Sequence, residues 1–169
     1  SAVPEVEDEA FDLLYNFREG NATTSETFDV DQLATYVALC DYLGAWHGLL
    51  WGNMRFYFDN EAKRLCPIGF DADAGYEIDQ LAEKNDKLMQ LNGAFHHHIF
   101  EDTAFVAAYH EALLTLNDEE YWSSFLKKHE TELEKIVALI AQNDLDYTFS
   151  PALIDRNRAK IQEALGVDR

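Results

Sequence analysis

Apolar residues recur at helical spacing along most of the chain, and proline or glycine stands where the helices should begin or end. The first helix is predicted to start at Pro4 and to end before Gly20, because proline suits a first helical turn and glycine follows a last one. A second helix is predicted from a cap at Asp29 or Asp31 to Gly44. Its apolar residues cover most of its circumference, which predicts burial. The Thr-, Ser- and Asn-rich residues between the two helices should form a loop.

The pattern changes from helical to strand-like in the middle of the chain. Residues 54–58 and 65–70 are short runs of β-favouring residues, and the polar residues 59–64 between them indicate the turn of a β-hairpin. Pro67 cannot donate a backbone hydrogen bond, which places the second strand at a sheet edge or at a bulge. One small hairpin is therefore expected here.

The helical pattern returns after Tyr76 and continues to the end of the sequence. Asn117 and Glu120 form a capping-box-like start for a long amphipathic helix. Ser150–Pro151 opens a last helix that Gly166 closes. The expected fold class is α+β and mostly α, a helical bundle that carries one small β-hairpin.

Composition supports a single domain over residues 1–169 and limits its partners. Hydrophobic residues make up 47 % of the chain, which is enough for a sizeable core. The formal net charge is −19, and the few Lys and Arg are scattered among carboxylates, which argues against nucleic acid or an anionic membrane as a partner. Any phosphate ligand would have to arrive with a divalent metal. No apolar run approaches the roughly 20 residues of a membrane-spanning helix.

The start of the sequence carries neither an initiator Met nor a signal peptide, which favours a fragment of a longer protein. Cys40 and Cys66 are too few for a disulfide framework and match no zinc motif. Both are expected to be free, buried and packed as small apolar residues, and a single disulfide between them is the alternative. The cellular compartment therefore stays open.

Polar residues that fit no core pattern bracket the predicted hairpin. His47 and Asn53 come before the first strand, and Asp71 and Asp73 follow the second. A hairpin brings its two ends together, so Asn53 and Asp71 should be neighbours. An amide oxygen beside a carboxylate is a donor pair that Mg²⁺ accepts. The alternative is that Asp71 and Asp73 only cap a turn.

The same stretch resembles the centre of the spore-coat protein H (CotH) kinase family. The matching strings are Gly44-Ala-Trp-His-Gly-Leu-Leu-Trp-Gly-Asn53, Met54-Arg-Phe-Tyr-Phe-Asp59 and Arg64-Leu-Cys-Pro-Ile-Gly-Phe-Asp71-Ala-Asp73. The resemblance covers residues 29–76 well and the later helices as a general pattern. The family consists of atypical kinases with a protein-kinase-like core. The resemblance therefore implies the C-lobe of a kinase-like fold, with Mg²⁺ and ATP as cofactors.

The family's site residues can be carried over position by position. Asn53 matches the catalytic-loop Asn and Asp71 matches the Asp of the Asp-Phe-Gly motif, which both hold Mg²⁺ in kinases. Asp73 matches a second acidic position in the same loop. A kinase has its base five residues before that Asn, where this sequence has Gly48. Glycine cannot accept a proton, so the adjacent His47 is the candidate base or orienting group, and a structural role in the loop is its alternative.

A complete kinase also needs a lysine on the phosphates and a glycine-rich lid. Before Arg55 the chain has one basic residue, Arg18, and before Gly44 it has one glycine, Gly20. The resemblance implies that this chain is a C-lobe and that an N-terminal lobe lies upstream in a parent protein. It also implies that the chain alone does not bind Mg²⁺ and ATP tightly and is inactive. The parent would transfer the γ-phosphoryl of ATP to Ser or Thr of a protein substrate, in a bacterial spore coat, an envelope or a secreted setting.

Two other interpretations stay open. The chain can be a non-catalytic module for coat or surface assembly that keeps the family fold, with a coat or envelope protein as its partner, and Gly48 favours this interpretation. It can also be an acidic helical domain without an active site, in which the residues around the hairpin only pack. The sequence does not indicate an oligomeric state.

The remaining histidines and aromatic residues have simpler explanations. The three adjacent residues His96–His98 should point in different directions, so at most two of them can share one metal ion. His110 and His129 are expected on helix surfaces, beside the carboxylates that follow them in the sequence. The aromatic residues around the hairpin are expected to fill the core; they are Trp46, Trp51, Phe56 and Tyr57.

Overall fold

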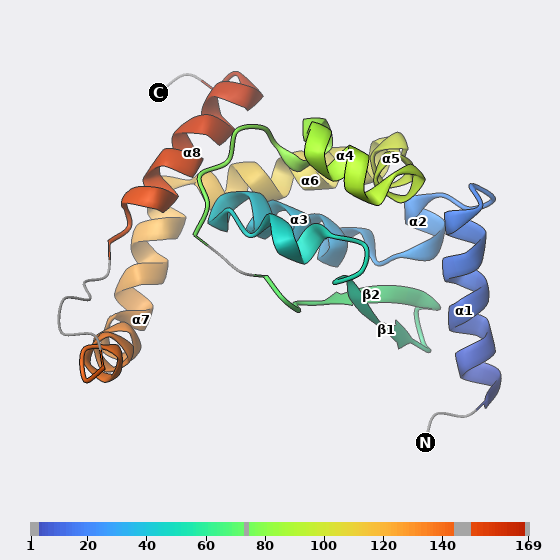
Figure 1. The fold of residues 1–169 in the computed structure, drawn as a ribbon, viewed down its shortest axis with the longest axis horizontal. Coiled ribbons are helices and arrows are strands. Elements are labelled where there is room, and N and C mark those ends of the chain that lie inside the picture. The colour runs from blue at the N-terminus through green and yellow to red at the C-terminus, as the bar shows by residue number, and fades with distance from the viewer. Residues whose placement is uncertain (1–3, 73–74, 144–149, 168–169) are drawn as a thin grey trace.

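The computed structural model describes residues 4–72, 75–143 and 150–167 (Figure 1). Its helices are α1 (Pro4–Arg18), α2 (Thr24–Thr27), α3 (Val30–Leu43), α4 (Asp86–Asn92), α5 (Ala94–Glu101), α6 (Thr103–Asn117), α7 (Glu119–Ile140) and α8 (Ala152–Leu165). The strands are β1 (Arg55–Asp59) and β2 (Arg64–Ile68), and two short 3₁₀ helices are η1 (Trp46–Leu49) and η2 (Ala82–Lys84). The described chain is therefore mostly helical with one small antiparallel hairpin, which confirms the predicted α+β class.

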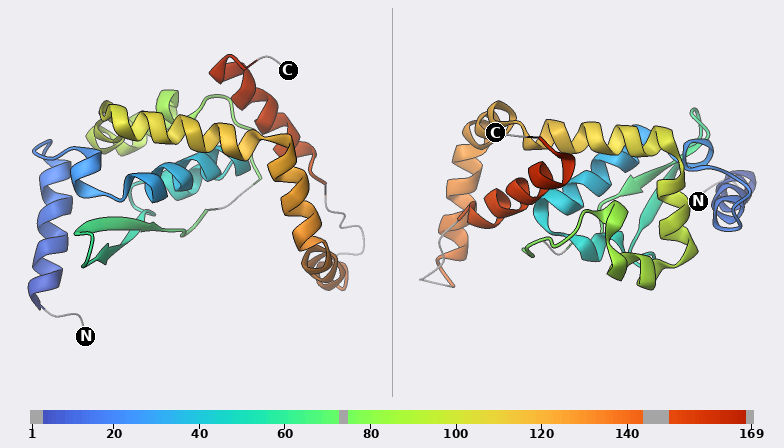
Figure 2. Two further views of the ribbon diagram at one scale, coloured as in Figure 1. Left: turned by 180° about the vertical axis from the view of Figure 1, so that it is seen from behind. Right: turned by 90° about the horizontal axis from the view of Figure 1, so that it is seen from above.

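Helices α3 and α6 lie side by side at the centre, and the other elements surround this pair (Figures 1 and 2). Helix α8 packs across both of them at one end. Helix α1 stands at the opposite end, against α2, α5 and β2. The hairpin lies on the side of α3 that faces away from α4 and α5. Helix α7 continues from α6 and projects away from this body.

Large apolar side chains from distant parts of the sequence fill the core. The largest fully buried ones are Phe17, Phe28, Leu33, Leu88, Phe105, Tyr109, Leu113 and Ile161. Three of the four aromatic residues expected in the core, Trp46, Trp51 and Phe56, pack against it. The expectation for Tyr57 is wrong, because this side chain is 46 % exposed on the hairpin. Cys40 and Cys66 are buried and free, as predicted.

The predicted hairpin is confirmed, and its register determines which residues lie at its base. Arg55 of β1 pairs with Ile68 of β2 at the base, and Asp59 pairs with Arg64 at the far end. The Asp59 carboxylate accepts backbone hydrogen bonds in the turn, from the N–H of the residues two and three positions on. Local turn chemistry thus fixes the register, and the register places the segments before β1 and after β2 together.

The first two predicted helices are confirmed, but the segment between them is not only a loop. It contains α2, whose capping box joins the Thr23 side chain to the Glu26 N–H and the Glu26 carboxylate to the Thr23 N–H. Helix α3 is capped by Asp29, whose carboxylate accepts a hydrogen bond from the backbone N–H of Gln32. Of the two caps that the sequence allows, the structure therefore has Asp29 and not Asp31. The predicted burial of α3 is incomplete, because Leu39 is 37 % exposed.

The segment 76–81, which we call the strap, has no regular secondary structure where the pattern predicts a helix. Two buried polar side chains from other helices hold it. The Asp41 carboxylate accepts a hydrogen bond from the N–H of Ala82 at 3.0 and 3.1 Å, at the end of the strap. The fully buried Asn157 side chain accepts from the N–H of Ile78 at 3.0 Å. These bonds satisfy backbone groups of the strap that a helix would have paired internally.

The long helix α7 starts one residue later than the sequence predicts. Asn117 is the last residue of α6, and Asp118 caps α7 by accepting from the N–H of Tyr121 at 2.8 Å. The predicted capping box of Asn117 and Glu120 is therefore wrong, although the helix exists. The last helix, α8, follows Pro151 and ends at Gly166 as predicted. In the described part of the chain, no helix has both the length and the apolar composition needed to cross a membrane.

Candidate functional site

The loop between α3 and β1 carries two of the predicted site residues, and three side chains fix its backbone. The Tyr36 hydroxyl donates to the carbonyl of Gly48 at 2.8 Å. The Asn92 side chain makes two bonds to the loop. Its Nδ2 donates to the carbonyl of Leu49 at 2.7 Å, and its Oδ1 accepts from the N–H of Trp51 at 2.8 Å. Asn53 supplies the third side chain, through a 3.1 Å bond to the carbonyl of His47. The sequence analysis missed Asn92 and Tyr36.

Replacing Asn92 with Ala is expected to loosen this loop. Both bonds of the amide would be lost, and a lost hydrogen bond to a partly buried group costs about 1–3 kcal/mol. Hydrogen exchange at the amides of Leu49 and Trp51 should accelerate by more than tenfold. Gln90→Ala is the matched control, because Gln90 is exposed on the same helix, α4. Equal exchange rates in both variants would show that Asn92 does not hold the loop.

Asn53 and Asp71 meet at the base of the hairpin, as the hairpin geometry predicts. The Asn53 Nδ2 donates to the Asp71 Oδ2 at 2.7 Å. The His47 Nδ1 lies 3.6 Å from the same carboxylate oxygen, so the three side chains form one cluster, which we call the candidate site. Asp71 adopts a left-handed backbone conformation, with φ of 49°, directly after β2 and Phe70. Asp73, the fourth predicted site residue, lies outside the described residues.

The candidate site is open to solvent. The side chains of His47 and Asp71 are 43 % and 47 % exposed, and Asn53 is half-buried. Water therefore screens the attraction between the imidazole and the carboxylate, so this pair adds little to folding stability. Its exposure leaves the carboxylate accessible to a ligand that arrives from solution.

The donor set fits Mg²⁺ in part. A carboxylate and a side-chain amide are hard oxygen ligands, and Mg²⁺ is commonly held by one or two protein groups while water and phosphate complete its coordination. Asp71 and Asn53 provide these two kinds of group, and the Asn53 Nδ2, rather than its Oδ1, faces the Asp71 carboxylate in the structure. Among the described residues, no group of three or more His, Cys, Asp and Glu side chains is arranged to hold a metal ion. A magnesium ion here would thus depend on ligands from phosphate and water.

The structure gives a physical reason for glycine at position 48, where a kinase has its base. A Cβ on Gly48 would lie 2.7 Å from the Tyr36 hydroxyl and 3.2 Å from the Cβ of Ala72. The residue after Asp71 and the side chain that fixes the loop therefore occupy the space of any side chain at this position. An Asp at position 48 would displace the Tyr36 hydroxyl, which holds the loop, and would crowd Ala72, so the packing of this loop favours the glycine.

A hollow of about 320 Å³ lies beside the candidate site, between the loop, the strap and α4. Trp46 and Lys87 line it, and the Lys87 Nζ lies 3.8 Å from the centre of the Trp46 ring system. The Trp46 ring also packs edge-on against His47, with ring centroids 4.8 Å apart. The Trp46 ring thus contacts both the His47 imidazole and the Lys87 ammonium group. The sequence analysis did not connect Lys87 with this region.

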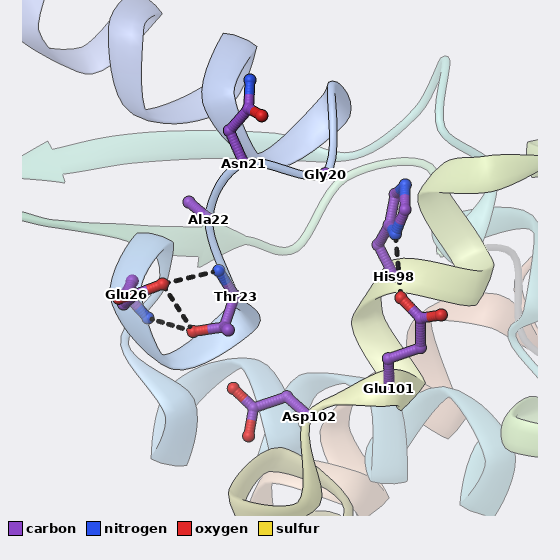
Figure 3. Close-up of a pocket in the computed structure, with 8 residues that line it drawn as sticks. All are labelled: Gly20, Asn21, Ala22, Thr23, Glu26, His98, Glu101 and Asp102. Atoms are coloured by element: carbon purple, nitrogen blue, oxygen red, sulfur yellow. Dashed lines mark hydrogen bonds and ion pairs between the residues drawn. The ribbon is translucent and has the colours of Figure 1, made fainter.

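A second hollow, of about 190 Å³, lies between the end of α1, α2 and α5 and shares no residue with the candidate site (Figure 3). Its polar side chains bond to one another or to neighbouring backbone. Glu26 belongs to the capping box with Thr23, and the His98 Nδ1 lies 3.0 Å from the Glu101 Oε2. Asp102 accepts from the N–H and hydroxyl of Ser25 and caps α6. This hollow is explained by helix capping and carries no site.

The histidines have structural partners. His96 is buried, with its Nε2 2.7 Å from the carbonyl of Ala82, and burial lowers the pKa of this imidazole. His97 and His98 both contact the Glu101 carboxylate, so the prediction that the three adjacent histidines point in different directions is wrong for these two, and only His96 points away from the others. His110 pairs with Glu83 and His129 with Glu132, rather than with the glutamates that follow them in the sequence.

No protein-family model, no curated protein and no solved structure matches the chain. The features that point to a function are therefore the candidate site itself and the sequence strings around it.

Proposed function

We propose that this chain is the C-lobe of a CotH-like atypical kinase, which holds Mg²⁺ and ATP at Asn53 and Asp71. The observation that carries the proposal is the 2.7 Å contact between these two side chains, which lie 18 residues apart on either side of the hairpin. In kinase-like folds the same two residue types flank the corresponding hairpin and hold the metal. With an N-terminal lobe, the domain would transfer the γ-phosphoryl group of ATP to a protein Ser or Thr.

Each residue of the candidate site would have a separate task. Bound Mg²⁺ would neutralise charge on the phosphates during transfer. Asp71 would hold the ion through its carboxylate, and Asn53 through its amide oxygen. Asn53 also ties the loop to Asp71, because its Nδ2 donates to the His47 carbonyl as well. His47 is the proton acceptor that remains near the site, since Gly48 offers none.

A non-catalytic binding module is the second candidate function, and the packing around Gly48 favours it. Such a module would bind the metal and the nucleotide at the same residues but would not transfer the phosphoryl group. Its partner would be a coat or envelope protein. The two functions share the binding step and differ in phosphoryl transfer, so a transfer assay on the full-length parent distinguishes them. In a parent that transfers the phosphoryl group, His47→Ala tests whether His47 is the proton acceptor. Unchanged transfer would remove His47 from the proposal.

Thermal unfolding tests the binding step. Millimolar Mg²⁺ with ATP should raise the midpoint of the chain, because a ligand that binds only the folded state stabilises it by an amount set by its concentration over its dissociation constant. At ten times that constant the gain is about 1.4 kcal/mol, or roughly 3–6 °C. Asp71→Asn should abolish the shift. Asp12→Asn, an exposed residue on α1 with the same change of charge, should keep it.

Two observations would contradict binding at Asp71. If Mg²⁺ and ATP leave the midpoint of the unaltered chain unchanged, or if Asp71→Asn shifts as much as Asp12→Asn does, Asp71 does not hold the ligand. The same measurement on the full-length parent then separates two cases. A shift in the parent would mean that the N-terminal lobe is needed for binding, and no shift there would make the chain a non-catalytic or acidic helical domain in which Asn53 and Asp71 only close the base of the hairpin.

A further inference from the structure

Arg55 is held at the base of the hairpin, between the two segments that carry the candidate site. It is the first residue of β1 and lies two positions after Asn53. Its Nη1 donates to the carbonyl of Gly52 at 2.8 Å and to the carbonyl of Met54 at 2.9 Å. Two backbone carbonyls of its own segment therefore fix one end of the guanidinium.

An aromatic ring from the other segment fixes the plane of the same guanidinium. The Cζ of Arg55 lies 4.7 Å from the centre of the Phe70 ring, and Phe70 directly precedes Asp71. Phe70 is 49 % exposed, so this stacking holds a charged group in place at the surface. A guanidinium that is stacked and bonded through one nitrogen loses less freedom when it binds a ligand.

The remaining donors of Arg55 are not used by acidic partners. Among the described residues, no carboxylate oxygen lies within 4.0 Å of its guanidinium, although the chain has 32 Asp and Glu. Asp71 contacts Asn53 and His47 instead. Nε and Nη2 of Arg55 have no hydrogen-bond acceptor in the part of the chain that the structure describes. A fixed cation with spare donors thus stands next to a candidate metal pair.

We propose that Arg55 is the cationic contact for the phosphate groups of the metal-bound nucleotide. This inference rests on the proposed function and adds to it a basic group for the phosphates, since Arg18 is the one basic residue before Arg55 in the sequence. A planar guanidinium presents parallel N–H donors that match phosphate oxygens, and such charge-assisted bonds are stronger than neutral ones. Asn53 and Asp71 would hold the ion, and Arg55 would hold the phosphates that bridge to it.

The competing explanation is that Arg55 only closes the turn before β1 through the Gly52 and Met54 carbonyls. The two explanations predict different responses to the loss of the charge. A purely structural Arg55 affects bare metal and metal–nucleotide binding in the same direction. A phosphate contact affects them differently, because a cation next to the site repels a bare metal ion but attracts the polyphosphate.

The experiment measures both affinities for Arg55→Gln. Mn²⁺ binding, followed by electron paramagnetic resonance, should stay within about threefold of the unaltered chain or become tighter, since a repelling charge is removed. Binding of Mg²⁺–ATP, followed by calorimetry, should weaken by about tenfold or more. Arg55→Lys keeps the charge but lacks the planar set of N–H donors. Its Mg²⁺–ATP affinity should therefore lie between that of the unaltered chain and that of Arg55→Gln.

Arg64→Gln is the matched control. Arg64 lies at the far end of the same hairpin and also donates to backbone carbonyls, those of Ser25 and Lys63. Its replacement removes the same charge and should leave Mg²⁺–ATP binding within about threefold. A thermal unfolding curve for each variant establishes that it is folded, and Arg55→Lys carries the test if Arg55→Gln is not.

The outcomes separate the inference from the proposed function. If the unaltered chain binds Mg²⁺–ATP and neither Arg55 variant weakens this binding, or if Arg64→Gln weakens it equally, the role of Arg55 is overturned while the metal site stands. If Arg55→Gln weakens Mn²⁺ and Mg²⁺–ATP binding equally, Arg55 only supports the turn. If the unaltered chain binds neither ligand, the proposed function fails, and the role of Arg55 fails with it.

Discussion

Gly44→Ala is expected to destabilise the chain by roughly 2–5 kcal/mol. Gly44 ends α3 with φ of 64°, a left-handed conformation that costs a residue with a Cβ about 1–2 kcal/mol. The strap also passes very close to this glycine. A Cβ on Gly44 would lie 1.7 Å from the carbonyl oxygen of Tyr76 and 2.7 Å from its carbonyl carbon. That carbonyl is held by the buried Asn157, whose Nδ2 donates to it at 3.1 Å. The strap would therefore have to move away from α3.

Gly166→Ala separates the two causes of this loss. Gly166 ends α8 with φ of 66°, but nothing lies within 4 Å of the position that its Cβ would occupy. Its replacement should cost only the backbone strain, about 1–2 kcal/mol. Urea unfolding followed by circular dichroism gives both values. If the two variants lose equal stability, the close approach of the strap to α3 is not a constraint on folding.

The sequence predicted the helices and the hairpin because their signals are local. Apolar spacing, Pro4, Gly44 and Gly166 identify α1, α3 and α8 without knowledge of the rest of the fold. The errors at helix ends are local too. Asn117 and Asp118 are adjacent residues that both suit a cap, and only packing decides between them. The pattern thus determined which elements form, and tertiary contacts determined where some of them begin.

The strap could not be predicted, because distant polar residues hold it. Asp41 and Asn157 look like unremarkable members of helices α3 and α8 in the sequence. Their bonds to the strap span more than 40 residues of sequence, and no spacing rule points to such partners. The helical pattern after Tyr76 was therefore overridden by buried hydrogen bonds that only the folded chain can form.

In the candidate site, too, the local contacts were predictable from the sequence and the distant ones were not. A hairpin predicts that Asn53 and Asp71 meet, since the geometry of two paired strands requires it. The support of the site was not predictable, because Asn92 reaches the loop from α4, 41 to 43 residues away. Tyr36 and Ala72 together explain why Gly48 has no side chain, and neither contact follows from a motif. The chemistry of a site is thus readable where its residues are close in sequence or paired by a hairpin.

Asp41 should make the stability of the chain fall as the pH rises from about 4 to 7. This carboxyl is buried at the centre of the molecule, and it bonds to the Ala82 N–H and the Tyr109 hydroxyl. Burial raises the pKa of Asp41 to about 7, from a usual value of 3.8. Below pH 4 the carboxyl is protonated in both states. Between about pH 4 and 7 the unfolded chain releases this proton while the folded chain keeps it, so the free energy of unfolding falls as the pH rises.

Asp41→Asn isolates this contribution. Asparagine does not ionise, and its amide oxygen can still accept from the Ala82 N–H while its amide group donates to the Tyr109 hydroxyl. The unfolding free energy of the variant minus that of the unaltered chain should therefore increase between pH 4 and 8. One pKa unit corresponds to about 1.4 kcal/mol, so a pKa shift of this size should give an increase of about 4 kcal/mol.

Urea unfolding at several pH values measures this difference, in which the other titrating groups cancel because both chains contain them. Asp31→Asn, an exposed residue on the same helix, controls for the change in net charge. A difference for Asp41→Asn that stays constant from pH 4 to 8 would mean that this carboxyl is already ionised in the folded chain at low pH. The strap would then be held to α3 by a buried anion, and Asp41→Asn would weaken that attachment at every pH rather than relieve it.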